Sequence, residues 1–112
     1  MTYHNKIFRA VQNTENGETS SETQFHYQQE GNILFGTYAG GRIVRGHLIG
    51  LVDDRGNIDM RYQQINSVGE IMTGTCQSKP EIMENGKIRL HESWKWTSGD
   101  LSSGTSVVEE VS

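Results

Sequence analysis

Glu92 is the side chain whose surroundings in the sequence most need a chemical explanation. In the segment IRLHESWKW, residues 88–96, alternate residues share a face of the predicted strand, and Glu92 shares its face with Leu90 and Trp94. A carboxylate in such an apolar row loses hydration, which raises its pKa or requires a partner. We expect either an ion pair with Arg45 or His47, if that face of their strand turns inward, or a donor group on a bound ligand.

The same alternation places five more aromatic or amide side chains on the inward faces of their strands. They are Tyr38, Tyr62, Gln64, Trp94 and Trp96. An aromatic lining with a few polar tips is typical of small-molecule pockets. It is equally typical of a packed barrel core with hydrogen-bonded tyrosines, and the sequence leaves these two interpretations open. These five residues and Glu92 are the candidate ligand-binding residues.

No catalytic or metal-binding arrangement is indicated. Apart from Glu70, near a turn, no second inward acid stands out to pair with Glu92 as a glycosidase would need. Cys76, in the middle of a predicted strand, is typical of a small buried packing residue. The four histidines fall on different predicted strands, mostly on outward positions: His4, His26, His47 and His91. We therefore expect no catalytic residue, no metal and no cofactor.

The segment GNILFGTYAGGRIVRGHLIG, residues 31–50, contains six glycines. A phosphate-binding loop needs glycines between a strand and the start of a helix. Here Gly36, Gly46 and Gly50 lie inside predicted strands, and the chain continues with Leu51–Asp54, which does not begin a helix. Glycine inside a strand marks a bend, a bulge or a close approach of backbones, so we favour a structural role.

Turn signals at intervals of about a dozen residues indicate an all-β chain. They predict eight strands, over residues 6–14, 19–29, 33–39, 42–53, 58–65, 71–79, 87–97 and 105–111. No segment shows helical periodicity with caps. Because closure leaves no exposed edge strand, we predict an eight-stranded antiparallel up-and-down β-barrel in preference to a sandwich. Such a barrel is filled by side chains or holds one small ligand.

Length and composition restrict the class of protein further. The 112 residues fit a single domain, over 1–112, and 10 basic against 14 acidic residues give a net charge of −4. That balance argues against nucleic acid as a partner. No apolar segment approaches the roughly 20 residues that span a bilayer, so no membrane association is expected. A lone cysteine suits a reducing compartment, and we expect a cytoplasmic protein.

The predicted strand 42–53 is apolar on both faces in its second half. Ile49 and Leu51 share one face, whereas Leu48 and Val52 share the other. A barrel has only one interior, so a neighbouring subunit is the best cover for the second face. We expect a homodimer or higher homo-oligomer that assembles through this strand.

Two short motifs resemble the avidins: GNILFGTY, residues 31–38, resembles the entry to their third strand, and WKWTSG, residues 94–99, resembles their seventh. Over most of residues 24–110, the chain is more specifically similar to a family of small, mostly uncharacterised bacterial proteins with an avidin-like domain. Motifs such as FHYQQEGNI, MRYQ, RLHE and WTSGD carry this resemblance, which implies an avidin-like or lipocalin-like (calycin-like) barrel. Some members are labelled N-acetylglutamate synthase, but the acetyl-CoA-binding turn of such enzymes does not occur here.

The avidin resemblance implies roles for three residues. Tyr38 matches the tyrosine that helps to bind the ureido oxygen of biotin, Trp94 matches a tryptophan of the biotin wall, and Tyr62 falls near a second wall tryptophan. The avidins' first-strand Asn and Ser, sixth-strand Ser/Thr pair and late aspartate find no clear counterpart. We therefore expect a non-enzymatic protein that binds an unknown small molecule but does not bind biotin with avidin strength. The alternatives are an enzyme of unknown reaction in the same cavity, and a structural or protein-binding oligomeric module.

Overall fold

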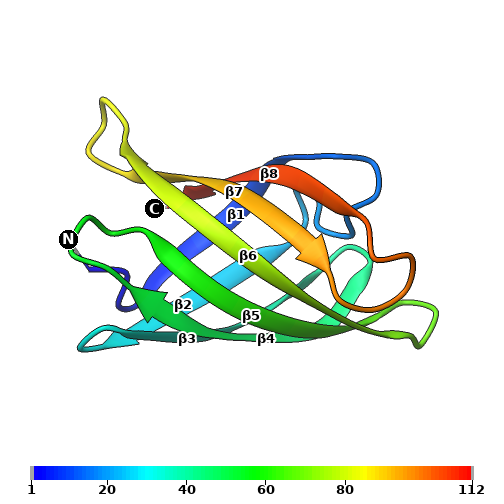
Figure 1. Cartoon of the computed structure of the whole chain (residues 1–112). Coiled ribbons are helices and arrows are strands. Elements are labelled where there is room, and N and C mark those ends of the chain that lie inside the picture. The colour runs from blue at the N-terminus through cyan, green and yellow to red at the C-terminus, as the bar shows by residue number, and fades with distance from the viewer. Residues whose placement is uncertain (1, 112) are drawn as a thin grey trace.

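The computed structural model describes residues 2–111, which form eight antiparallel strands. The strands are β1 (Lys6–Asn13), β2 (Gln24–Glu30), β3 (Ile33–Gly40), β4 (Ile43–Val52), β5 (Ile58–Asn66), β6 (Ile71–Ile82), β7 (Ile88–Trp96) and β8 (Ser103–Glu110). Each strand pairs with its neighbours in the chain, and β1 pairs with β8 to close the barrel (Figure 1). The predicted eight-stranded up-and-down β-barrel is confirmed. Met1 and Ser112, the ends of the predicted domain, lie outside the described residues.

The largest difference from the predicted strands is the start of β2. The prediction began this strand at residue 19, but residues 14–23 form a loop and β2 begins at Gln24. The Thr23 hydroxyl accepts a hydrogen bond from the Ser20 amide at 3.0 Å and donates one to the Gly40 carbonyl at 3.1 Å, which turns the chain before β2. This loop lies at the same end of the barrel as the loop that joins β7 to β8 (Figure 1).

A β-bulge in β4 decides which of its aliphatic side chains face the interior. The pairing register with β5 shifts between Ile43 and Arg45. As a result Ile43 and Leu48 are both buried, whereas Ile49 and Leu51 are exposed. In a regular strand, Ile43 would share the face of Ile49 and Leu51. The outer face of β4 therefore keeps large aliphatic side chains in contact with solvent.

Two strand glycines allow neighbouring backbones to approach closely. A Cβ atom on Gly36 would overlap the carbonyl oxygen of His26 on β2, and one on Gly50 would overlap the carbonyl of Asp59 on β5. Both glycines lie within strands, and residues 53–57, which follow β4, form a turn. The structural interpretation of these two glycines is therefore confirmed.

Tyr3 closes one end of the barrel. Its side chain is fully buried, packs near the rings of Phe8 and Tyr27, and donates a hydrogen bond from its hydroxyl to the carbonyl of Gly56. Burial, assisted by the charge of Asp53, raises the pKa of Tyr3 to about 12. Aromatic side chains therefore fill this end of the barrel.

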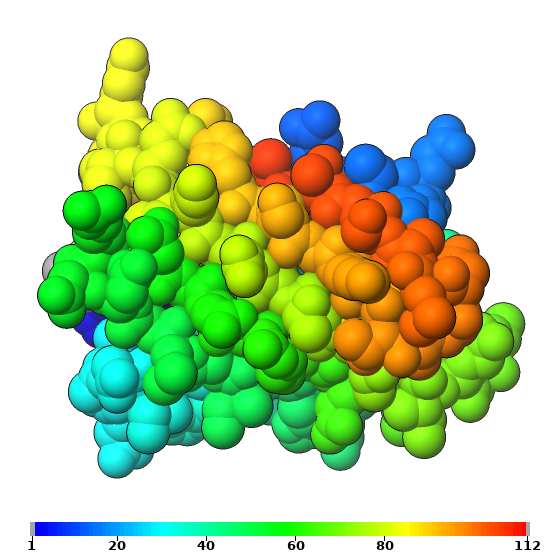
Figure 2. Space-filling view, viewed as in Figure 1, coloured from blue at the N-terminus to red at the C-terminus, as the bar shows by residue number. Residues whose placement is uncertain are grey.

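One face of the barrel wall can be followed in the space-filling view (Figure 2). Figure 2 shows side chains covering the wall formed by β5 to β8, with the turn between β6 and β7 projecting at one end. Within residues 2–111, no helix has the length and apolar character that spanning a membrane requires.

Candidate ligand-binding site

The side chains of β7 alternate between the interior and the surface along the whole strand. Ile88, Leu90, Glu92, Trp94 and Trp96 are all buried, and the residues between them are exposed or half-buried. The inward face predicted for this segment is confirmed. It places one carboxyl group and two indole rings inside the barrel.

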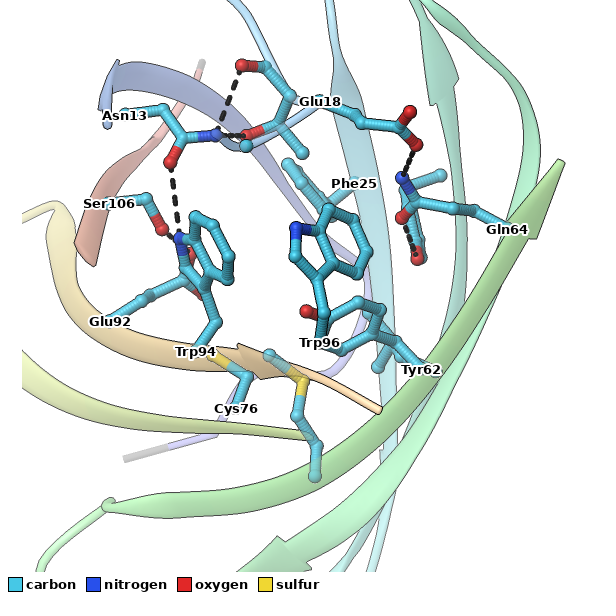
Figure 3. Close-up of a pocket in the computed structure, with 15 residues that line it drawn as sticks. Asn13, Glu18, Phe25, Tyr62, Gln64, Cys76, Glu92, Trp94, Trp96 and Ser106 are labelled. Atoms are coloured by element: carbon cyan, nitrogen blue, oxygen red, sulfur yellow. Dashed lines mark hydrogen bonds between the residues drawn. The ribbon is translucent and has the colours of Figure 1, made fainter. Parts of the chain in front are cut away.

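A cavity of about 50 Å³ lies among the inward side chains, next to the loop formed by residues 14–23 (Figure 3). The structure brings all six candidate residues to its lining: Tyr38, Tyr62, Gln64, Glu92, Trp94 and Trp96. A cavity needs about 10–15 Å³ of such volume to hold one water molecule, so this one has room for a few water molecules or a compact ligand.

Aromatic rings form most of the cavity wall. The rings of Trp94 and Trp96 lie 5.4 Å apart at an interplanar angle of 59°, and Tyr62 meets Trp96 edge-on at 5.9 Å. Phe25, which the sequence did not single out, stacks on Tyr38 at 4.9 Å and lines the cavity as well. Edge-on and offset contacts of this kind hold rings in fixed orientations.

Glu92 is held by hydroxyl groups from both neighbouring strands. Ser106 on β8 donates a hydrogen bond to Oε1 at 2.8 Å, and Ser78 on β6 donates one to Oε2 at 3.3 Å. Both serines are the cross-strand partners of Glu92 in the sheet register. Burial raises the pKa of the Glu92 carboxyl, and hydrogen bonds from these serines and from Cys76 oppose the shift.

The expected ion pair between Glu92 and a residue of β4 is wrong. Arg45 and His47 are both exposed on the outside of the barrel, because the bulge in β4 leaves Gly46 and Leu48 as its inward residues. The carboxyl is hydrogen-bonded to neutral hydroxyl groups instead, and no ion pair with it occurs among residues 2–111.

A chain of hydrogen bonds at the mouth of the cavity leads to a second carboxylate. Tyr38 donates from its hydroxyl to Oε1 of Gln64 at 2.7 Å, and Gln64 donates from Nε2 to Glu18 at 2.7 Å. Asn66 donates to the other oxygen of Glu18 at 2.8 Å, and Arg42 lies 3.8 Å from that oxygen with its side chain mostly exposed. Glu18 is itself buried. The loop is thus tied to β5 across the barrel mouth.

Sequence reasoning missed Glu18, and no signal in the sequence points to it. Its surroundings, TENGETSSET at residues 14–23, are uniformly polar and show no alternation that could assign a face. Its burial follows from the path of the loop, which long-range contacts determine.

The two indole N–H groups of β7 also bind this loop and the last residue of β1, which precedes it. Trp94 donates from Nε1 to the side-chain oxygen of Asn13 at 3.1 Å, and Trp96 donates from Nε1 to the carbonyl of Asn16 at 3.0 Å. Asn13 in turn donates to the Thr19 hydroxyl at 2.8 Å. These contacts fix the loop above both tryptophans, as Figure 3 shows for Asn13 and Trp94.

The remaining polar groups of the cavity are poor nucleophiles. Burial, followed by the charge of Glu92, raises the pKa of the Cys76 thiol well above its usual value, so the thiol stays protonated. Burial likewise raises the pKa values of Tyr38 and Tyr62. Among residues 2–111, no three histidine, cysteine, aspartate or glutamate side chains are grouped to hold a metal ion. The arrangement is suited to hydrogen bonding and enclosure.

Comparison with known proteins agrees with this architecture. The family model described as avidin-like protein matches residues 1–111. No curated protein matches the chain. The family match spans all eight strands and every residue of the cavity lining.

Proposed function

Because the chain belongs to the avidin-like protein family, we propose that it is a non-catalytic protein that binds one small molecule inside its barrel. The observation that carries this proposal is the cavity between the aromatic rings of β7 and the buried carboxyl of Glu92. A pocket with mostly aromatic walls and a few convergent polar groups is the usual form of a small-molecule site.

Binding is better supported than catalysis. The thiol and phenol groups of the cavity have raised pKa values, so none supplies an anionic nucleophile near neutral pH. N-acetylglutamate synthase chemistry, the label of some similar proteins, has no support in the cavity, whose lining lacks a turn suited to acetyl-CoA.

Biotin is not the ligand that this cavity favours. The cavity has a volume of about 50 Å³, far below the roughly 300 Å³ at which pockets for drug-sized ligands begin. The Tyr38 hydroxyl, which the avidin resemblance assigns to the ureido oxygen, already donates to Gln64. Each ureido or carboxylate group left without a partner costs about 1–3 kcal/mol. Calorimetric titration with biotin is therefore expected to give no nanomolar affinity.

Native mass spectrometry of the protein purified from its own cells tests the proposal. We expect one retained compound per barrel, released on denaturation and absent from Trp94→Ala. Lys95→Ala, on the outer face of the same strand, is the matched control and should keep the compound. A packed core would behave differently: the parent protein would retain no compound, and Trp94→Ala would lower the free energy of unfolding by about 3–5 kcal/mol. That combined result would contradict the proposal.

We also propose that the barrel forms a homo-oligomer through β4 and that the protein is cytoplasmic. The first is supported by an apolar patch on the outer wall, formed by Ile33 and Phe35 of β3 and Ile49 and Leu51 of β4, where Ile49 and Leu51 are 59% and 56% exposed. The second is supported by Cys76, the single cysteine, which is buried and free.

A further inference from the structure

Ionisable charge inside the barrel has one sign. Glu18 and Glu92 are buried and both line the cavity. In contrast, none of the 10 lysines and arginines or the four histidines is buried, and all of them lie within residues 2–111. A buried carboxylate is normally paired with a cation or coordinates one, because desolvation is otherwise unfavourable.

The two carboxylates differ in how completely the chain satisfies them. Glu18 receives hydrogen bonds from the amides of Gln64 and Asn66 and has Arg42 nearby. Glu92 receives hydrogen bonds from neutral hydroxyl and thiol groups, and within the described part of the chain no cation pairs with it. Of the two buried carboxyl groups, Glu92 is therefore the one that has hydrogen-bond donors but no positively charged partner among the described residues.

We propose that the ligand is a small primary amine, bound as its ammonium ion with N–H groups donating to the carboxylate of Glu92. This inference rests on the proposed binding function and specifies its ligand class. An ammonium group supplies the positive charge that is missing beside the Glu92 carboxylate. Its three N–H donors can be shared between the carboxylate and nearby hydroxyl oxygens.

The walls of the cavity favour the same class of ligand. The indole rings of Trp94 and Trp96 and the phenol rings of Tyr38 and Tyr62 line the space beside Glu92. A cation over the face of an aromatic ring is attracted by the ring's electron distribution, most strongly for tryptophan. An anionic ligand meets two carboxylates and π-faces instead. A volume of about 50 Å³ restricts the amine to a short chain.

The test uses three probes of nearly equal size and different charge: n-propylamine, n-propanol and propionate. We expect calorimetric titration to detect propylamine at near-neutral pH, to give about tenfold or more weaker binding for propanol, and to detect no propionate. Equal binding of propylamine and propanol, preference for propionate, or binding of none of the three overturns the inference.

Variants of Glu92 assign the preference to its carboxylate. Glu92→Gln is expected to lower the affinity for propylamine by about tenfold or more and to leave propanol unchanged. Glu92→Asp keeps the charge and should keep the preference for the amine over the alcohol. Glu109→Gln, on a half-buried acid outside the cavity lining, is the matched control. Unchanged amine binding in Glu92→Gln contradicts the inference.

The pH dependence of the wild-type protein gives a second measurement that needs no variant. The groups that face Glu92 are neutral. Ser78 and Cys76 of β6 and Ser106 of β8 face it from the neighbouring strands, and Tyr27, Tyr38 and Tyr62 face it from β2, β3 and β5. Only the ionised carboxyl can pair with ammonium, so propylamine affinity should fall as pH drops through the raised pKa of Glu92. Propylamine affinity that does not fall as the pH is lowered from neutral to the ordinary carboxyl pKa of 4.5 overturns the inference.

Failure of the inference and failure of the proposed function give different results. A neutral or anionic compound retained in native mass spectrometry, with no binding of propylamine, removes the amine and leaves the binding function. The absence of both a retained compound and probe binding removes both. A retained primary amine supports both.

Discussion

At the scale of single residues, Glu92 shows what the sequence alone can predict. Alternation along 88–96 predicted its inward position, because neighbouring positions on a strand must face opposite ways. Its partners could not be predicted, because Ser78 and Ser106 come from strands whose register with β7 is set by the whole sheet. Arg45 and His47 complement Glu92 in charge, but the bulge in β4 places both side chains outside the barrel.

Glu92→Gln should make the free energy of unfolding less sensitive to a rise in pH. Burial raises the pKa of Glu92 in the folded state above its ordinary value of 4.5, so the folded protein holds this proton more tightly than the unfolded chain. The resulting stabilisation is fully present below that ordinary value and is lost as pH rises through the folded pKa. The variant lacks this loss, so its stability relative to wild type should increase with pH.

Urea unfolding of both proteins at about pH 4 and about pH 8 measures this difference. Glu84→Gln, in the exposed turn between β6 and β7, controls for removal of a carboxyl group as such. A variant that becomes less stable relative to wild type as pH rises would show that Glu92 is better stabilised as an anion than its hydroxyl partners indicate.

At the scale of elements, regular strands were predictable and the irregular segments between them were not. Seven turn signals gave strand positions mostly within a few residues of the observed ones, since each hairpin is a local feature. The loop 14–23 was partly assigned to a strand, because its polar residues carry no periodicity and its path depends on bonds to Gln64, Asn66 and the indoles of β7. The loop 14–23, which covers the cavity, is therefore the part of the fold that sequence patterns did not predict.

The absence of a side chain at Gly46 lets the ring of Tyr38 pack against the backbone of β4, and Gly46→Ala tests this contact. A Cβ atom at Gly46 would overlap the ring of Tyr38, which stacks on Phe25 and is tied through its hydroxyl to Gln64. Because these contacts restrain the ring, we expect Gly46→Ala to lower the free energy of unfolding by about 1–3 kcal/mol. Chemical denaturation measures the loss.

A double-mutant cycle with Tyr38→Leu shows whether the overlap is the cause. In the Tyr38→Leu background, Gly46→Ala should cost markedly less, because the ring that the new methyl group meets is gone. Equal costs in both backgrounds would place the effect in the backbone of β4 and not in the packing of Tyr38.

At the scale of the whole molecule, the two ends of the barrel have different roles. One end is filled by Tyr3 and its hydrogen bond to Gly56, whereas the other carries the cavity under the loop 14–23. If the proposed ligand enters from this end, it passes Glu18, and the hydrogen bonds from Tyr38 through Gln64 to Glu18 must then open or adjust. The wall between the ends is left for contacts with other molecules.

The apolar patch of β3 and β4 makes the assembly of barrels testable. Ile33 and Leu51 are paired across the two strands, Ile49 lies beside Phe35, and Ile33, Ile49 and Leu51 are all exposed in the single barrel. If a second copy covers this patch, Ile49→Glu places a carboxylate in an apolar interface and should weaken self-association by about tenfold or more. Ile82→Glu, at an equally exposed isoleucine at the end of β6, is the matched control and should associate like wild type. Sedimentation equilibrium over a range of protein concentrations measures the self-association of both variants and of wild type. Assembly through this face is excluded if the wild-type protein stays monomeric, or if Ile49→Glu associates as strongly as wild type.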